Sequence, residues 1–245
     1  MRNKRTVIGI VAVLVAALTA SIAWAAPGDT IQTVKGAISP SKLPKKKFKN
    51  SAINVQTSTG VEGEDGMADP ALRPPPAERA LLTFDKDVKF DTKGVAKCTA
   101  NLNGTSTAAA KDACGSSVVG GGAAEIAIGS GANRFDAVVT AFNGPTQNGN
   151  PSLLLHSRVD DLGTTAILIG ELKKAGKVYK LDVAIPQIAN GQGSVTKFQT
   201  KVKDGKYVQA KCPDKKFDIK GTFFYDDDTQ ETAKSSSTCK GTGRR

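Results

Sequence analysis

The chain has 245 residues and a formal net charge of +11 at pH 7, with 39% hydrophobic, 5% aromatic and 23% charged residues. This length is sufficient for one domain with a sizeable hydrophobic core. The low aromatic content argues against nucleic acid as a partner, because proteins that read RNA or single strands stack bases on aromatic rings. The excess of positive charge favours either solubility or attraction to an anionic partner.

The first 25 residues have the layout of a secretory signal peptide. Arg2, Lys4 and Arg5 form a positive n-region, an apolar run follows from Val7, and an A-x-A cleavage site ends at Ala25. The alternative is an uncleaved anchor, but the apolar run is at the short end of the ~20 residues that one membrane span needs. We expect an exported mature chain, residues 26–245, that folds as a single domain and has no transmembrane segment after signal cleavage.

Residues 41–50, SKLPKKKFKN, contain five lysines and no acid. This composition is typical of a loop or of a protected edge strand, where lysines block edge-to-edge aggregation. The functional alternative is weak attachment to anionic cell-wall polymer or to lipid headgroups, to which each lysine would contribute about 1 kcal/mol. The acidic stretch from Glu62 to Asp69 would offset part of this charge if it folded back. The candidate contact residues are Lys42, Lys45, Lys46, Lys47 and Lys49.

Residues 60–79 are acidic and then proline-rich, and they include the run PPP. Three consecutive prolines favour polyproline II and exclude a central strand. Since strand patterns lie on both sides, we interpret the segment as a long exposed loop within the domain.

Alternation of apolar and polar residues with a period of two dominates the rest of the chain, and Gly, Asn and Asp interrupt it at short intervals. In VTKFQTKVK, for example, Phe198 and Val202 share a face opposite four polar residues. The segments SLLLH and TAILIGEL are more continuously apolar, which is typical of central strands covered on both faces. We therefore predict an all-β fold, a single antiparallel β-sandwich or barrel-like sandwich of about ten strands. The expected strands lie within residues 31–38, 51–58, 80–85, 125–129, 135–142, 152–156, 165–172, 177–186, 195–203 and 216–225.

One short helix is expected near residues 105–114, with Thr105 or Ser106 as its N-cap and Gly115 as its stop. It lies between the first two of four cysteines. An even number of cysteines in an exported chain predicts disulfides, and proximity favours Cys98–Cys114 and Cys212–Cys239. Zinc is disfavoured because the chain has no C-x-x-C pair and a single histidine.

His156, in LLLHSRVDD, is the only histidine of the chain and the first residue to test for catalysis. Alternation places it with Leu154 and Arg158, opposite Leu153 and Leu155. No G-x-S-x-G motif supplies a nucleophile, and the cysteines are expected to be oxidised. We interpret His156 as a structural residue of a strand.

Other patterns that suggest a ligand also have structural explanations. The glycines at 120–122 precede a strand and lack a following Lys-Ser/Thr, so they indicate a flexible entry to the strand or a bulge rather than a phosphate loop. Asp85 with Asp87, residues 160–161 and residues 226–228 do not fit a calcium-binding frame, and Asp is common in turns. Glu125 and Glu171 are the carboxylates on strands that a glycosidase would use, but the sequence does not place them together. No cofactor or metal site is expected.

Several stretches resemble a group of exported, disulfide-bonded proteins of high-GC Gram-positive bacteria that carry no assigned activity. The stretches are LTFDKDVKFDTKGVAKC, VTAFNG, LLLHSR, YKLDVAIP and CPDKKFDIKGTFFYDD. The resemblance covers roughly residues 30–240 and implies an extracytoplasmic location and an all-β fold. It transfers no functional residue.

Two functional hypotheses follow. The first is a non-catalytic, envelope- or surface-associated module with a binding or structural role. The second is a secreted hydrolase that uses carboxylates or His156 at the mouth of the sheet. The hydrolase requires two titratable groups that converge in a concave pocket, whereas the binding module requires only a contiguous basic or apolar surface.

Overall fold

The structure is a computed structural model that describes residues 30–203 and 205–243. The expected signal peptide, residues 1–25, lies outside the described residues. The strands are β1 (Thr30–Ser39), β2 (Lys42–Pro44), β3 (Lys49–Asn50), β4 (Ala52–Val61), β5 (Ala77–Phe84), β6 (Val88–Phe90), β7 (Val118–Ile128), β8 (Asn133–Asn143), β9 (Ser152–Val159), β10 (Thr164–Ala175), β11 (Val178–Ala184), β12 (Gly193–Val202), β13 (Val208–Ala210), β14 (Lys216–Tyr225), β15 (Gln230–Thr238) and β16 (Lys240–Thr242). The helices are α1 (Thr107–Cys114) and the 3-10 turns η1 (Gly115–Ser117) and η2 (Ala189–Gly191).

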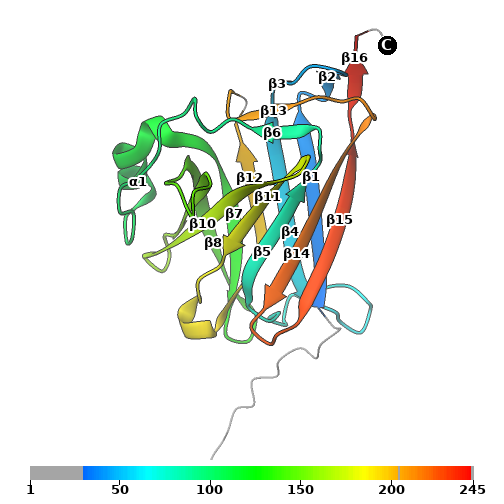
Figure 1. Ribbon diagram of the computed structural model, residues 1–245. Helices are drawn as coiled ribbons and strands as arrows, with labels where there is room; N and C mark the ends of the chain where they lie inside the picture. Colours follow the sequence, from blue (N-terminus) through cyan, green and yellow to red (C-terminus); the bar gives the residue numbers. More distant parts are fainter. Residues whose placement is uncertain (1–29, 204, 244–245) are drawn as a thin grey trace, which may run out of the picture.

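Eleven strands form one antiparallel sheet in the order β1-β4-β12-β7-β8-β9-β10-β11-β5-β14-β15. The sheet curls until its two end strands, β1 and β15, contact each other, so that it nearly closes into a barrel (Figure 1). This confirms the all-β prediction and selects the barrel-like form over two separate sheets. Alternation explains the curl, because the inward residues of every strand can share one interior.

Two small sheets lie at one end of the barrel (Figure 1). β3, β13 and β6 form one of them, and β2 pairs in parallel with β16 in the other. Val88 and Val208, from β6 and β13, are 1% and 0% exposed, so the three-stranded sheet closes this end of the interior.

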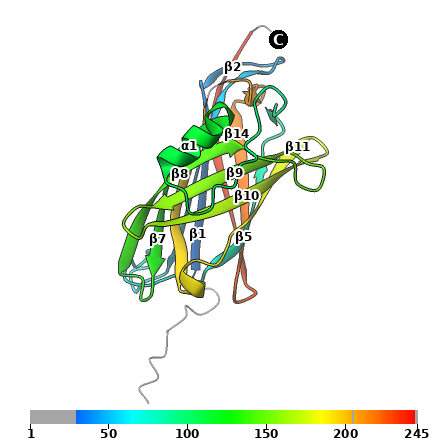
Figure 2. The same cartoon turned by 90° about the vertical axis from the view of Figure 1, so that its left-hand side faces the viewer.

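The main core fills the inside of the barrel. Leu155, Leu181, Phe198 and Val202 point inward, as the period-two pattern predicts. A second cluster lies on the outer face, where Cys98, Leu102 and Cys114 pack with Phe142 and Leu154. Figure 2 shows α1 lying across β8 and β9 on this side. Both faces of β9 are therefore covered, which explains its continuous apolar run.

The helix starts and ends where the sequence predicts. The side chain of Ser106 accepts a hydrogen bond from the N–H of Ala109, at 3.2 Å, as an N-cap does. Gly115 follows the last residue of the helix, Cys114, as the expected stop. Its φ of −54° is helical, and the chain continues directly into η1.

The glycines at 120–122 belong to β7, and the register between β7 and β8 shifts between Val118 and Gly120. A Cβ atom on Gly122 would overlap the carbonyl group of Gln199 on the neighbouring β12. Glycine is required here because the two strands approach closely, which fits the bulge interpretation and not a phosphate loop.

The proline-rich segment is only partly the exposed loop that the sequence predicts. β4 extends to Val61 and β5 begins at Ala77, so the loop covers residues 62–76. Its acidic half is largely exposed, but Pro74, Pro75 and Pro76 are buried. The carbonyl of Pro74 accepts a hydrogen bond of 2.6 Å from Ser194 Oγ, which holds the prolines against β12.

Candidate functional site

The five lysines singled out in the sequence lie together at the end of the barrel that carries the small sheets (Figure 1). Lys42 is in β2, Lys49 is in β3, and the other three lie in the bend between these strands. Four of them are exposed and Lys45 is half-buried. In the described part of the chain, none of the five forms an ion pair within 4.0 Å. Their charge is therefore available to a partner.

Phe48 lies in the middle of this lysine run, and its side chain points outward. The residue is 36% exposed, which makes it one of the exposed large apolar residues of the described chain. Lys89 Nζ and Lys211 Nζ lie 5.0 and 5.3 Å from the centroid of its ring. These cation–π contacts bring two further lysines, from β6 and from the segment after β13, to the surface that the sequence predicted.

A further lysine joins the surface through strand pairing. Lys240 in β16 is the register partner of Lys42 in β2. We name this surface the basic end and define it by the five predicted lysines together with Phe48, Lys89, Lys211 and Lys240. Sequence reasoning missed the last three because they come from distant segments, and only the pairing of β2 and β3 with other strands brings them together.

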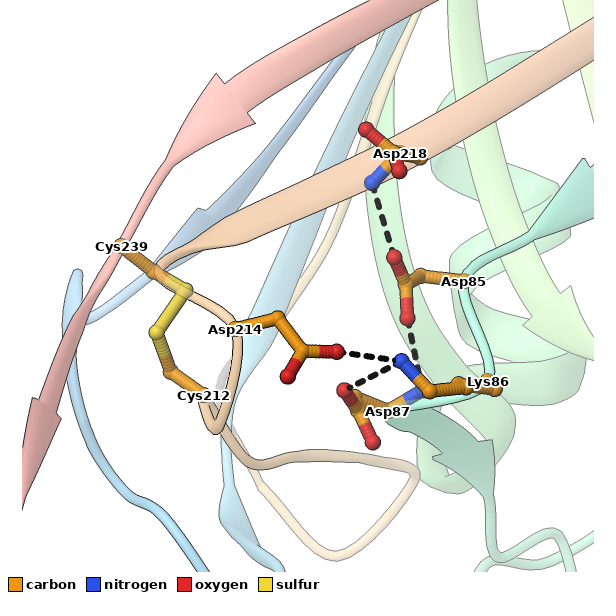
Figure 3. The surroundings of a disulfide bond; sticks show 7 residues. All are labelled: Asp85, Lys86, Asp87, Cys212, Asp214, Asp218 and Cys239. Atoms are coloured by element: carbon orange, nitrogen blue, oxygen red, sulfur yellow. Dashed lines mark hydrogen bonds and ion pairs between the residues drawn. A yellow bond between two sulfur atoms is a disulfide. The ribbon is translucent and has the colours of Figure 1, made fainter.

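The Cys212–Cys239 disulfide, shown in Figure 3, is joined to the basic end by backbone hydrogen bonds. The N–H of Cys212 donates to the carbonyl of Pro44, at 2.9 Å, and the N–H of Lys45 donates to Thr242 O, at 3.2 Å. The disulfide therefore ties the lysine-bearing bend to β16. The pairing found here and at Cys98–Cys114 is the one that proximity predicted. Disulfides are typical of proteins in oxidising, extracellular compartments.

Acidic residues beside the disulfide engage other lysines and not the five predicted ones (Figure 3). Lys86 Nζ lies 2.6 Å from Asp214 Oδ2 and 3.3 Å from Asp87 Oδ2, and Lys211 Nζ lies 3.2 Å from Asp87 Oδ1. Asp85 accepts hydrogen bonds from the N–H groups of Asp87 and Asp218, at 2.9 and 3.0 Å. These carboxylates have donors from the protein itself, as in a structural turn.

The acidic stretch from Glu62 to Asp69 does not fold back onto the lysines, so it does not offset their charge in the way that the sequence left open. β4 separates the two segments, and ten extended residues span about 30 Å. The stretch lies at the opposite end of the barrel, where the β9–β10 and β14–β15 turns add residues 160–161 and 226–228. We name these three segments the acidic end. The lysine run and these acidic segments therefore lie at opposite ends of the barrel, although Asp85, Asp87 and Asp214 also lie near the basic end.

The remaining calcium candidates at this end also form turns. Asp227 accepts hydrogen bonds from the N–H and Oγ1 of Thr229, at 3.0 and 2.6 Å. Asp228 has a φ of 63°, a left-handed conformation that Asp tolerates in turns. Asp160 pairs with Arg158 at 3.1 Å. Among the described residues, no group of three or more His, Cys, Asp and Glu side chains is placed to hold a metal ion.

His156 lies on the outer face of β9, beneath the segment that leads into α1. It is 0% exposed, and its Nε2 lies 3.1 Å from both Oγ1 and the carbonyl oxygen of Thr105. Burial lowers the pKa of His156, against the opposing hydrogen bond to Thr105. Within residues 30–203 and 205–243 no carboxylate contacts the ring. The group that a hydrolase would need as a base is therefore enclosed and has no orienting acid.

The two strand carboxylates lie apart, on the outer face of the barrel. Glu125 is on β7 and Glu171 is on β10, with β8 and β9 between them. Glu125 pairs with Arg134 and Lys197, and Glu171 pairs with Lys173 at 2.8 Å. A glycosidase requires two carboxylates that flank the same glycosidic bond. Because two strands lie between Glu125 and Glu171, their carboxylates are not placed in this way.

Comparisons with known proteins identify no family for this chain. No protein-family model matches the chain, and no curated protein matches it. One solved structure that matches is the N-terminal domain of the adhesin Sgo0707 of Streptococcus gordonii, with 10% sequence identity and a TM-score of 0.34. The match covers 85% of this chain and 32% of that chain, so this chain spans about a third of the solved one. Neither a family nor a function follows from a similarity of this size. Among the described helices, none has the length and apolar character needed to cross a membrane.

Proposed function

We propose that this protein is an exported, non-catalytic binding module that attaches to the anionic lipid surface of the cell envelope through its basic end. The observation that carries the proposal is the run of five lysines, none of which has an ion-pair partner in the described chain, beside the partly exposed ring of Phe48. The two disulfides and the signal-peptide pattern support an extracytoplasmic location.

The electrostatic part of the attachment comes from the five lysines at 42, 45, 46, 47 and 49. Each lysine close to an anionic membrane contributes about 1 kcal/mol, so five hold the protein reversibly. Because the acidic end is on the far side of the barrel, its repulsion from the same membrane is screened beyond about 10 Å at 0.1 M salt.

Phe48 favours lipid over wall polymer as the partner. A charged polymer offers phosphate groups but little apolar volume, whereas the interface of a bilayer accepts an aromatic ring. Phe48 lies among the lysines, so that the ring and the ammonium groups reach the same surface together. Reversible peripheral membrane binding combines a weak apolar contribution with a weak electrostatic one. Phe48 supplies the first and the lysines supply the second.

The test is co-sedimentation of the mature protein with vesicles of phosphatidylcholine alone or with one quarter phosphatidylglycerol, at 0.05 and 0.5 M NaCl. We expect binding to the anionic vesicles that is lost at high salt. Changing the five lysines to Gln should lower the partition coefficient at least tenfold, and Phe48→Ser should lower it about threefold or more.

A matched control separates the basic end from net charge. Lys35, Lys174, Lys201, Lys220 and Lys234 are exposed on the wall of the barrel, and none of them forms an ion pair in the described chain. Changing these five to Gln alters the net charge equally and should leave binding near the parent level. Equal losses in both variants would overturn the proposal, because net charge would then account for binding. Binding to purified cell-wall polymer but not to vesicles would assign the surface to the wall instead.

A further inference from the structure

The interior of the barrel is not completely filled. A cavity with about 100 Å³ of space for the centres of water-sized molecules lies among the inward side chains of β4, β5, β9–β12 and the small sheet. A single water needs about 10–15 Å³ by this kind of measure, so the cavity is several times larger than one water. It is independent of the basic end and needs its own explanation.

Most of the cavity wall is hydrocarbon. Leu82, Leu155, Leu168 and Phe198 are among its lining residues, and Phe84 and Phe90 close it toward the basic end. The rings of Phe84 and Phe90 are in edge contact, with centroids 5.1 Å apart. Burying apolar surface against such a wall favours an apolar occupant, since each methylene removed from water stabilises the bound state.

Four residues with hydroxyl groups, Thr57, Thr59, Thr200 and Tyr207, interrupt this wall. Thr200 is 6% exposed and Tyr207 is 4% exposed, and both line the cavity. In the described part of the chain, neither Thr200 Oγ1 nor Tyr207 Oη has a hydrogen-bond partner. A buried hydroxyl without a partner is costly, and native proteins rarely retain one without an explanation. Two of them on one cavity indicate that the occupant supplies the missing partner.

The other end of the cavity leads toward the acidic end. A second, narrower cavity of about 20 Å³ shares Ala77, Ile185 and Val195 with the first and continues to Pro186 and Asp226. This narrower cavity lies toward the acidic end, so a molecule that entered through it would enter on the side away from the basic end.

We propose that the barrel interior binds a small, uncharged, mainly apolar molecule with one hydrogen-bonding oxygen, of the size of a phenol or a short alkanol. The hydrocarbon wall binds the apolar body, and the hydroxyls of Thr200 and Tyr207 bind the oxygen. The site does not depend on the basic end, and a protein without membrane affinity would still have it.

Phenol and benzene form the critical pair of probes. They have similar shapes, but a purely apolar cavity rejects phenol because its hydroxyl would lose its water partners. Titrations of the mature protein by calorimetry, with methyl chemical shifts recorded in parallel, should show that phenol binds and shifts interior methyls such as those of Leu82 and Leu155. In a series of n-alkanols the affinity should rise about threefold to fourfold per methylene and stop rising when the chain fills the cavity.

The variant Thr200→Val with Tyr207→Phe removes both hydroxyls and keeps the shape of the wall. We expect it to lose at least fivefold in phenol affinity while its benzene affinity is unchanged or higher. Ala80→Leu fills part of the cavity from β5 and should abolish binding of both probes. If Ala80→Leu does not fold, the hydroxyl variant alone decides between the outcomes.

Three results would overturn the assignment. They are no binding of any probe at 10 mM, an unchanged preference for phenol in the variant without the hydroxyls, and shifts confined to surface methyls. Each of them leaves the attachment to anionic vesicles unaffected, so the two proposals fail separately.

Discussion

Protonation of Glu125 is expected to destabilise the protein in acid. Its Oε1 accepts hydrogen bonds of 2.7 Å from Arg134 Nη1 and from Thr196 Oγ1, and its Oε2 lies 3.0 Å from Lys197 Nζ. Burial alone would raise the pKa of Glu125, but the hydrogen bonds from Thr196, Lys197 and Arg134 outweigh it and lower the pKa to about 2. The substitution Glu125→Gln removes the charge with little change in shape.

The size of the pKa shift sets an upper limit on how much the ionised Glu125 side chain contributes to the free energy of unfolding. A fall from 4.5 to about 2 corresponds to about 3 kcal/mol, at 1.36 kcal/mol per pKa unit. The side chain of Glu125 is 20% exposed and that of Lys197 is 67% exposed, so solvent screening reduces the contribution to about 1–2 kcal/mol. Because the folded-state pKa is depressed, this contribution is complete above the unfolded-state pKa near 4.5. It disappears as the pH falls through 2.

The assay is denaturant unfolding of the parent and Glu125→Gln at several pH values between 7 and 2. The difference in unfolding free energy should be about 1–2 kcal/mol at pH 7 and should vanish near pH 2. Other carboxylates with lowered pKa values titrate in both proteins and cancel in the difference. Glu64→Gln, in the exposed loop, should show no such pH-dependent difference. If the difference in unfolding free energy between the parent and Glu125→Gln stayed constant with pH, the stabilisation would not come from the charge of Glu125.

Three further predictions concern stability. The two disulfides join cysteines that are 16 and 27 residues apart in sequence. Reducing each of them should lower the unfolding free energy by about 3 kcal/mol. Equal melting temperatures with and without reductant would contradict this. Burial lowers the pKa of His156 in the folded state, so lowering the pH below 6.5 should decrease the unfolding free energy. The variant His156→Gln should lack this part of the pH dependence in the same unfolding assay. Gly122→Ala should destabilise by more than about 3 kcal/mol because its Cβ would overlap β12, whereas Gly115→Ala, with nothing within 4 Å, should be neutral or slightly stabilising by thermal unfolding.

Much of the fold could be predicted because inward and outward residues alternate. Phe198 and Val202 share the inner face, and His156 lies with Leu154 on the outer face, as the period-two pattern indicates. The strand β15 shows the limit of this signal. Its residues QETAKSSST are exposed or half-buried throughout, so no apolar alternation marks it in the sequence. Its place in the sheet is set by pairing with β14.

The functional surfaces depend on contacts that local patterns do not contain. The lysine run was visible in the sequence, but Lys89 and Lys211 join it only because β6 and β13 pair beside β3. Thr200 belongs to an ordinary alternating strand, and Tyr207 follows it in a short connection. Their hydroxyls lack partners because most side chains around them in the interior are apolar, which is a property of the curled sheet and not of either segment.

The positions of the basic end and the acidic end determine how the two proposed sites would be arranged on a membrane. An anionic surface attracts the basic end and repels the acidic end, so the barrel is expected to stand with its basic end against the lipid. The three-stranded sheet β3-β13-β6 closes the interior on that side, with Val88 and Val208 buried in it. The narrower cavity beside Ile185 and Asp226 then lies on the side away from the lipid. A small apolar molecule would therefore exchange with the aqueous phase and not directly with the bilayer, and attachment would not block its entry.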